Sequence, residues 1–290
     1  MLFRSSLPFF KIYIGGLGHP PASSDLANAE ADYIRSQLIR WFDQWLKGDD
    51  TGILAEPRVT LAPERTEDWS TNSFRLADAV PLPGTTPHTL FINSAGLTDT
   101  PPGLVKPQKL PPTARGLDVL TALLKLVGIN DTNLITSAVA VNDILNSGAA
   151  DILDPKMFTQ TDGNARRLGY NSPLLAADLT IIGAPVARLY VSAKKPGACY
   201  FVQVEEKFAN GNVKLVTRGA FKDTASDSKS PHAIAVPLFA VNHTFQAGSQ
   251  IKLLIASRDY PFFLPNLHQP KAVVYRDTDH PSALELPVAP

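Results

Sequence analysis

The chain of 290 residues is long enough for one large domain or for one and a half ordinary domains. Its 27 basic and 27 acidic side chains balance, so it lacks the basic excess of a nucleic-acid-binding protein. Hydrophobic residues make up 44% of the sequence and charged residues 19%, which predicts a buried core and excludes wholesale disorder. Because no apolar run approaches the roughly 18 residues of a membrane span, we expect no membrane partner.

The turn-forming residues favour a β-rich body. Twenty-five prolines and eighteen glycines predict many turns and few long helices. The lone Cys199 excludes an internal disulfide, and it is typical of a small buried apolar residue.

The first fifty residues have the pattern of one strand followed by one helix. Residues 9–14 form an apolar run that ends in two glycines, as expected of a buried strand that enters a tight loop; the basic Lys11 interrupts it and argues against a signal peptide. Residues 25–47 then carry apolar side chains at helical spacing, and Gly48 can end the helix in a left-handed conformation. The stripe consists of Ala31, Ile34, Leu38, Trp41 or Phe42, and Trp45. A stripe with two tryptophans requires a larger apolar partner than one short strand.

The remainder of the chain indicates many short strands. Strand patterns occupy residues 58–61, 89–93, 186–192, 200–204, 213–217, 234–236, 251–255, 272–275 and 284–286. Asn210-Gly211-Asn212 between two of these runs predicts a hairpin turn. Residues 113–150 have partly helical spacing and interrupt the series. Short strands separated by turns predict a β-sandwich or jelly roll.

Five phrases in a fixed order carry a resemblance to a known family. They are WFDQWLKG from residue 41, LLAADLTIIG from residue 174, HTFQAGSQIKL from residue 243, SRDYP from residue 257 and HPSALELPV from residue 280. Together they resemble the C-terminal part of serine hydrolases of the X-Pro dipeptidyl-peptidase and cocaine-esterase type. The resemblance runs from about residue 15 to the C-terminus.

The resemblance implies a mainly β chain of two parts. Residues 1–50 would be the last strand and helix of an α/β-hydrolase domain. Residues 51–290 would be a jelly-roll β-sandwich, similar to galactose-binding modules, with a helical insertion near residues 113–150. In such enzymes the jelly roll packs against the catalytic domain and helps to form the wall of the active site.

The resemblance also assigns a catalytic role to His19, in the turn Gly18-His19-Pro20-Pro21. In a Ser-His-Asp triad this imidazole takes the serine proton and returns it to the leaving group. The triad order in α/β hydrolases is Ser, Asp, His, so the other two members would precede His19. The sequence contains no Gly-x-Ser-x-Gly motif, and Ser94 in the nearest phrase is typical of a turn. We therefore expect no hydrolysis by this chain alone, which would be a fragment, a truncated reading frame or one product of a split gene.

Two functions follow as hypotheses. In the first, the chain completes a serine hydrolase whose α/β-hydrolase domain or subunit lies elsewhere, acting on a peptide after proline or on an ester. In the second, it is a non-catalytic β-sandwich module that binds carbohydrate or a protein, and a homo-oligomer fits either hypothesis. Candidate sugar-binding residues are Trp69, Asp259, Tyr260, Phe262, Phe263 and Asn266, although packing of the aromatic ones is the simpler interpretation.

The other histidines carry weaker signals. His243 and His280 are expected in packing or structural positions, and His88, His232 and His268 as exposed loop groups. No histidine pair has metal-ligand spacing, so we predict no catalytic metal and no cofactor.

Overall fold

The computed structural model describes residues 9–15, 25–62, 74–110, 167–226, 230–257, 259 and 269–290. These residues form a mainly β protein with one long helix, which confirms the expected fold class. The expected helical insertion at residues 113–150 and His19 both lie outside this set. None of the helices within it is long and apolar enough to cross a bilayer.

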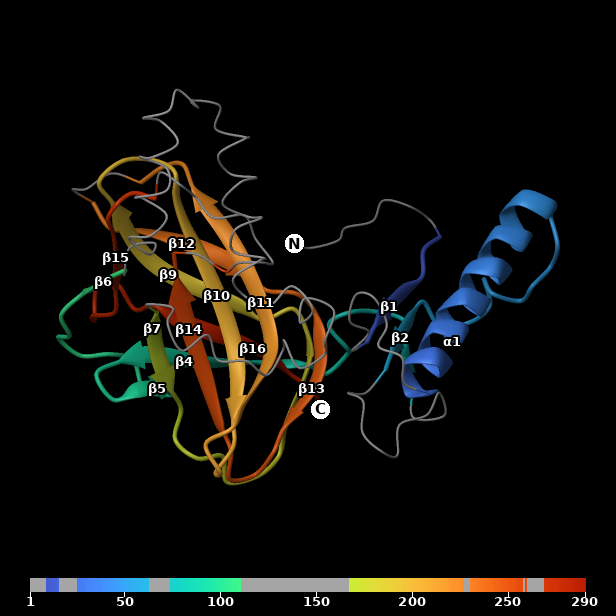
Figure 1. Ribbon diagram of the computed structural model, residues 1–290, viewed down its shortest axis with the longest axis horizontal. Coiled ribbons are helices and arrows are strands. Elements are labelled where there is room, and N and C mark those ends of the chain that lie inside the picture. The colour runs from blue at the N-terminus through green and yellow to red at the C-terminus, as the bar shows by residue number, and fades with distance from the viewer. Residues whose placement is uncertain are drawn as a thin grey trace, which may run out of the picture.

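Two sheets face each other and form a β-sandwich (Figure 1). The smaller sheet has the order β11-β10-β14-β7, with β7 at Leu168–Asn171, β10 at Ala198–Lys207, β11 at Val213–Asp223 and β14 at Gln250–Ala256. The larger sheet has the order β13-β8-β16-β9-β15-β6, with β12 added at β9 and with β4 and β5 added at β16. Its strands are β4 Thr86–Asn93, β5 Gly96–Thr98, β6 Gln108–Lys109, β8 Leu179–Gly183, β9 Val186–Ala193, β12 His232–Pro237, β13 Val241–Phe245, β15 Ala272–Tyr275 and β16 Ala283–Val288.

The main core lies between the two sheets because each strand alternates its side chains between two faces. On β10, Tyr200, Val202 and Val204 point inward and are fully buried. They meet alternate residues of β9 in the larger sheet, such as Leu189. The predicted hairpin joins β10 to β11, and Gly211 in its turn has φ 86°, a conformation that glycine adopts without strain.

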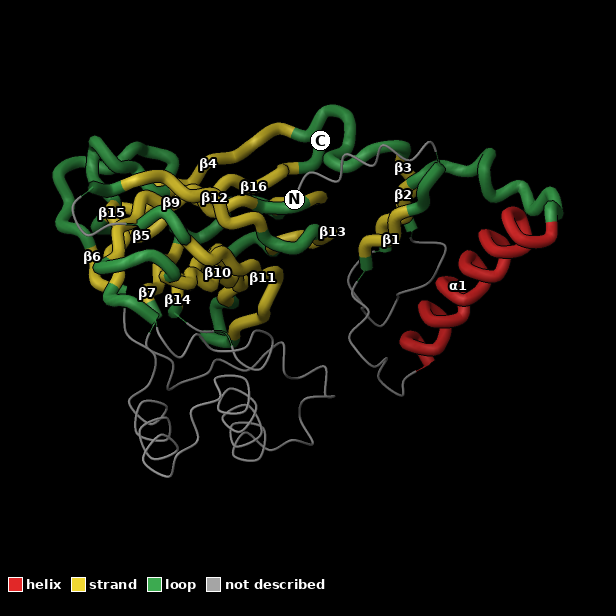
Figure 2. The backbone as a smooth tube through the Cα atoms, turned by 90° about the horizontal axis from the view of Figure 1, so that it is seen from above, coloured by secondary structure: helices red, strands yellow, loops and turns green. Residues whose placement is uncertain are grey.

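A third, smaller sheet stands beside the sandwich. It has the order β1-β2-β3, with β1 at Ile12–Ile14, β2 at Val59–Leu61 and β3 at Arg75–Ala77. Strands β1 and β2 are parallel, and helix α1 (Asp25–Phe42) connects them. In both views the small sheet lies between α1 and the sandwich (Figure 1, Figure 2).

A second apolar cluster joins the small sheet to the sandwich. Ile14, Val59 and Leu61 from the small sheet pack with Leu82 and with Ile182 of β8. The cluster therefore attaches the sheet of β1, β2 and β3 to the sandwich beside β8.

Most of the expected elements in the described chain are confirmed, with changes at their ends. The helix expected over residues 25–47 is present: α1 continues into a π-helical turn, η1 (Asp43–Lys47), and Gly48 ends it at φ 79°. The strand expected over residues 9–14 is shorter, since only Ile12–Ile14 pair with a neighbour.

Candidate functional site

The segment that contains His19 connects two elements that the structure describes. Strand β1 ends at Ile14, and α1 begins at Asp25. Close to these ends, the Tyr13 hydroxyl donates a hydrogen bond to the carboxylate of Glu30, which is fully buried on α1. The two flanks of the segment are therefore tied directly to each other.

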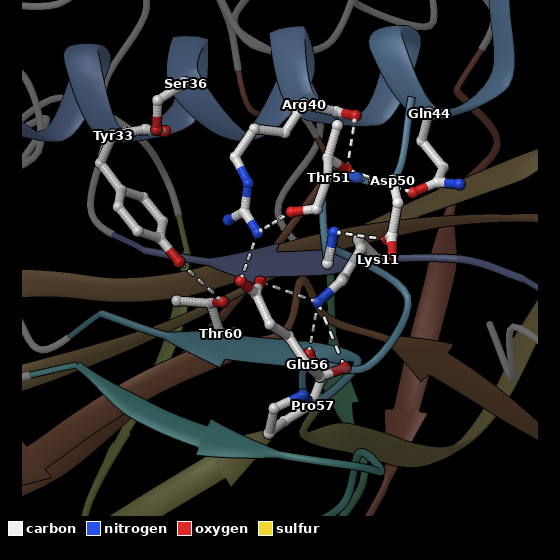
Figure 3. Close-up of polar contacts among 11 residues, drawn as sticks. Lys11, Tyr33, Ser36, Arg40, Gln44, Asp50, Thr51, Glu56, Pro57 and Thr60 are labelled. Carbon is white, nitrogen blue, oxygen red and sulfur yellow. Dashed lines mark hydrogen bonds and ion pairs between the residues drawn. The ribbon is translucent and has the colours of Figure 1, made fainter. Parts of the chain in front are cut away.

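Glu56 ties the same two elements a second time (Figure 3). Its Oε1 accepts a hydrogen bond from Arg40 Nη2 of α1 at 2.6 Å, and its Oε2 accepts one from Lys11 Nζ at 3.3 Å. Lys11 also donates to the Pro57 carbonyl at 2.9 Å. Burial raises the pKa of Glu56, but Arg40 and Lys11 outweigh this effect and the net pKa is lowered. The Glu56 carboxylate thus links the residue before β1, the last turn of α1 and the loop before β2.

The face of α1 that meets the small sheet is unusually polar. Tyr33 Oη lies 3.2 Å from Thr60 Oγ1 on β2. Thr51 donates to the Arg40 carbonyl at 3.1 Å, and its own amide donates to Gln44 Oε1 at 3.1 Å. Figure 3 shows these side chains reaching from the helix toward the sheet and loop. The ring of Tyr33 also packs against Phe74, with centroids 4.8 Å apart. The inward face of the helix therefore combines polar contacts with aromatic packing, whereas an ordinary surface helix fills this face mainly with apolar side chains.

Five large apolar side chains lie exposed on the outer face of the helix. We define the apolar helix face as Leu38, Ile39, Phe42, Trp45 and Leu46, which are 46–78% exposed. Phe9 lies over Trp45 with ring centroids 5.2 Å apart and extends this face. The stripe expected from the sequence is present in part: Leu38, Phe42 and Trp45 lie on this face, whereas Ala31, Ile34 and Trp41 are partly buried. No element in the described part of the chain covers the apolar helix face.

Ser94, the only serine near a nucleophile motif, is an exposed turn residue between β4 and β5. Asn93 Oδ1 accepts the Ala95 amide at 2.8 Å and fixes this turn. No buried base contacts Ser94 among the hydrogen bonds of the described residues, so the structure agrees with its interpretation as a turn residue.

Each of the four described histidines lies beside an acidic side chain, and only His243 is fully buried. His243 is buried against Glu206, with Nε2 and Oε2 3.1 Å apart, as its expected packing role requires. His280 is half-buried beside Asp277. His88 is half-exposed on strand β4 and not in a loop, and it pairs with Asp99 at 2.6 Å.

His232 corrects an expectation. It begins strand β12, its side chain is only 30% exposed, and its Nε2 is buried 3.1 Å from Asp223 Oδ2. The flanking Pro231 and the polar residues before it suggested a loop, but pairing with Val191 of β9 draws His232 into the sheet.

Asp259 is not available for a sugar hydroxyl. It is 4% exposed, accepts Gln203 Nε2 at 2.7 Å on Oδ1 and Arg218 Nη1 at 3.0 Å on Oδ2, and so has both oxygens occupied. The other candidate sugar-binding residues lie outside the described residues; they are Trp69, Tyr260, Phe262, Phe263 and Asn266. Within the part of the chain that is described, no three His, Cys, Asp or Glu side chains gather into a metal cluster.

We expect the Glu206–His243 pair to make stability depend on pH. Burial raises the pKa of Glu206, but His243 and the Gln246 and Ser249 hydrogen bonds lower it below 4.5 on balance. A carboxyl whose pKa is lower in the folded state than in the unfolded state stabilises the fold at pH values above the unfolded-state pKa. This stabilisation is lost as the pH falls through the folded-state pKa. The free energy of unfolding, measured with denaturant, should therefore be higher for the wild type than for Glu206→Gln near pH 6–7. This difference should shrink below about pH 4.5. A difference that stays constant down to pH 3 would contradict this prediction.

The described architecture defines a class: a β-sandwich accessory domain carrying a strand–helix–strand unit whose helix is apolar on its outer face. Residues 51–285 match the family model of the X-Pro dipeptidyl-peptidase C-terminal non-catalytic domain. The chain belongs to this family, as its sequence resemblance implied.

Individual relatives are hydrolases of greater length. A Mycobacterium bovis protein with the provisional name serine esterase is 26% identical over 280 residues, covering 87% of this chain and 40% of that protein. The structure of an aminopeptidase from a marine-sediment Thaumarchaeota archaeon matches with a TM-score of 0.60 and 17% sequence identity. The match covers 90% of this chain and 44% of the aminopeptidase chain. The structure of a CocE/NonD family hydrolase from Staphylococcus aureus matches with a TM-score of 0.59 and 12% sequence identity. The match covers 97% of this chain and 49% of the hydrolase chain. The chain thus spans under half the length of these proteins.

Proposed function

We propose that the chain works as the C-terminal part of a serine hydrolase of the X-Pro dipeptidyl-peptidase and esterase type. In this proposal His19 is the triad histidine. The proposal places the nucleophilic serine and the aspartate in an α/β-hydrolase core that this chain does not contain; the relatives are more than twice as long as the part that this chain matches. The β-sandwich supports that core and contributes to the wall of its active site.

The observation that carries the proposal is the orientation of α1. Its polar face is satisfied by Glu56, Thr51 and Thr60, whereas its apolar helix face is exposed. Exposure of several large apolar side chains on one face costs free energy in water, at about 25 cal/mol per Å². Such a helix is suited to lie between the small sheet and a second apolar body, which here is the hydrolase core.

Strand β1 offers a second contact to the same core. It is parallel to β2, and in the described residues its other edge has no partner. An open strand edge presents unpaired backbone N–H and C=O groups, so it favours addition of another strand. The free edge and the apolar helix face belong to one strand–helix unit, and one partner can cover both.

The names of the relatives support acyl transfer to water as the reaction but leave the substrate class divided. One relative is named an esterase and another an aminopeptidase. We propose a peptide or an ester substrate, with the acyl pocket and oxyanion donors in the hydrolase core.

We expect Leu38→Asp combined with Phe42→Asp to abolish association with the hydrolase core. Two carboxylates buried in an apolar interface cannot be solvated, so binding and ester or X-Pro hydrolysis should fall together. The test mixes the chain with the separately expressed hydrolase core of a longer relative, and measures complex formation by light scattering and hydrolysis of p-nitrophenyl acetate and Gly-Pro-p-nitroanilide.

The matched control is Leu104→Asp combined with Leu174→Asp, which changes two leucines that are 96% and 64% exposed away from the helix. These substitutions should leave association and hydrolysis unchanged. His19→Ala should permit association but abolish hydrolysis. Association that survives the Leu38 and Phe42 changes would contradict the docking role, and full activity of His19→Ala would contradict the triad role. Self-association of the chain through the same face would instead favour the homo-oligomeric module.

A further inference from the structure

Helix α1 carries a fully buried carboxylate in its second turn. This residue is Glu30, and its side chain is closed off from solvent. Glutamate is almost never fully buried unless it is paired, because an apolar environment disfavours its charged form. Its Oε1 accepts a hydrogen bond from the hydroxyl of Tyr13, which lies on strand β1. A buried carboxylate of the helix is therefore held by a tyrosine of the strand.

The Tyr13–Glu30 pair packs against the point where the chain leaves β1. Gly15 is the first residue after this strand. A Cβ at this position would lie 2.5 Å from Tyr13 Cε1 and 2.6 Å from Glu30 Oε1. Such distances are shorter than real Cβ contacts, so any side chain at residue 15 would displace the pair. The exit of the chain from β1 is thus fitted closely against the first turns of α1.

The ring of Tyr13 is fixed independently of its hydroxyl. Its centroid lies 6.1 Å from that of Tyr33 on α1 and 5.9 Å from that of Phe74. Aromatic rings about 4.5–7 Å apart stabilise one another. The ring packing places the side chain between strand and helix, and the hydroxyl then joins it to Glu30. Removal of the hydroxyl alone should leave the ring in place.

The pair spans the connection on which the proposed triad histidine lies. Strand β1 ends at Ile14 and α1 begins at Asp25, so Tyr13 precedes this connection and Glu30 follows it. A hydrogen bond between the two side chains fixes the separation and the relative direction of the two ends of the connection. Functional residues on loops depend on such support from the rigid elements that flank them.

We propose that Tyr13 and Glu30 form a positioning pair for the triad histidine. The pair fixes both ends of the connection that carries His19, and so keeps the imidazole aligned with the serine and the aspartate of the hydrolase core. The pair acts through His19 and not on the substrate. This inference rests on the proposed triad role of His19. It goes beyond that role because it assigns a task to a buried carboxylate that the triad itself does not use.

The test uses Tyr13→Phe in the full chain, mixed with the separately expressed hydrolase core of a longer relative. The substitution removes only the hydroxyl and keeps the ring that packs on Phe74. We expect kcat to fall at least about tenfold and KM to change by less than about twofold, because a small misplacement of a catalytic group slows the chemical step and leaves substrate binding intact. Association with the core should stay as in the wild type, since Tyr13 is not part of the apolar helix face.

Two other positions test the same hydrogen bond by different means. Gly15→Ala pushes a methyl group against the pair and should lower kcat as Tyr13→Phe does. Glu30→Gln keeps an oxygen that can accept the Tyr13 hydroxyl, so its kcat should stay within about threefold of the wild type. Glu30→Leu removes the acceptor and should lower kcat at least about tenfold. Three positions keep the test valid if one variant fails to fold.

The matched control is Tyr33→Phe. It removes a tyrosine hydroxyl that lies 3.2 Å from Thr60 Oγ1 and ties the same helix to β2 instead of β1. Its kcat should stay within about twofold of the wild type, even if its melting temperature falls. Equal losses of kcat in Tyr13→Phe and Tyr33→Phe would overturn the positioning role, because they would reflect a general weakening of the helix.

The failure of this inference and the failure of the proposed function give different results. Wild-type kcat in both Tyr13→Phe and Gly15→Ala, beside an inactive His19→Ala, would overturn the positioning pair alone. Absence of hydrolysis by the wild-type complex would overturn both. A low kcat with unchanged KM in the Tyr13 and Gly15 variants, together with an active Glu30→Gln, is the result that supports the pair.

Discussion

Arg218→Ala should destabilise the chain by about 3–5 kcal/mol, since it removes the cation that is hydrogen-bonded to the buried Asp259 carboxylate. Arg218 and Asp259 are 8% and 4% exposed and lie 3.0 Å apart on the outer face of the smaller sheet. Burial lowers the pKa of Arg218 and raises the pKa of Asp259, so desolvation opposes both charges. Each charge is tolerated because the other is present. Urea unfolding followed by circular dichroism measures the loss.

Two further variants separate the charge effect from packing. Arg218→Met combined with Asp259→Leu removes both charges and should recover much of the lost stability, because a buried ion pair is often no better than apolar packing. Arg188→Ala breaks an exposed pair with Glu285, in which Arg188 is 58% exposed, and should cost at most about 1 kcal/mol. A loss of the same size for Arg188 and Arg218 would contradict the importance of burial.

Gly96→Ala should destabilise the chain by more than about 3 kcal/mol through two additive causes. Gly96 begins β5 with φ +119°, which side chains with a Cβ rarely adopt. A Cβ at this position would also stand 2.2 Å from the Asn171 carbonyl oxygen on β7. The carbonyl is backbone of the opposite sheet and cannot move aside without shifting its strand. Thermal and urea unfolding of the variant test this expectation.

Gly211→Ala is the matched control for that experiment. Gly211 also has a positive φ, at +86°, but nothing lies within 4 Å of the position of its Cβ. Gly211→Ala should therefore lower the free energy of unfolding only by the backbone strain, about 1–3 kcal/mol. Equal losses at Gly96 and Gly211 would show that the contact with Asn171 contributes nothing.

The role of the sandwich in this protein is best understood from what it leaves exposed. Two contacts among the described residues join it to the small sheet: Ile182 packs with Ile14, Val59 and Leu61, and Asn242 Nδ2 donates a hydrogen bond to the Ala62 carbonyl. The apolar helix face is carried on that stable base. The proposed docking to a hydrolase core therefore presents a pre-formed surface, which lowers the conformational entropy lost on association.

The sequence by itself determined the elements with strong local signals. The helix at residues 25–47, its end at Gly48, the hairpin at Gly211 and the long strands of the sandwich all depend on periodicity or on turn residues. The apolar stripe on the helix was predicted in part, since Leu38, Phe42 and Trp45 lie on its exposed face; the need of this face for a partner stays a prediction. The family resemblance followed from ordered phrases that the family match confirms.

The tertiary structure decided what depends on contacts between distant residues. Strands β3, β5 and β6 have only two or three residues, so their pairing and not their pattern defines them. Sequence spacing could not show that Glu56 bonds both Lys11 and Arg40, or that His232 and Asp223 meet beside Tyr200. Local periodicity specifies which face of a helix is apolar, but only the packed chain shows that the polar face is the one turned inward. That orientation is what makes the outer face of α1 available for a partner.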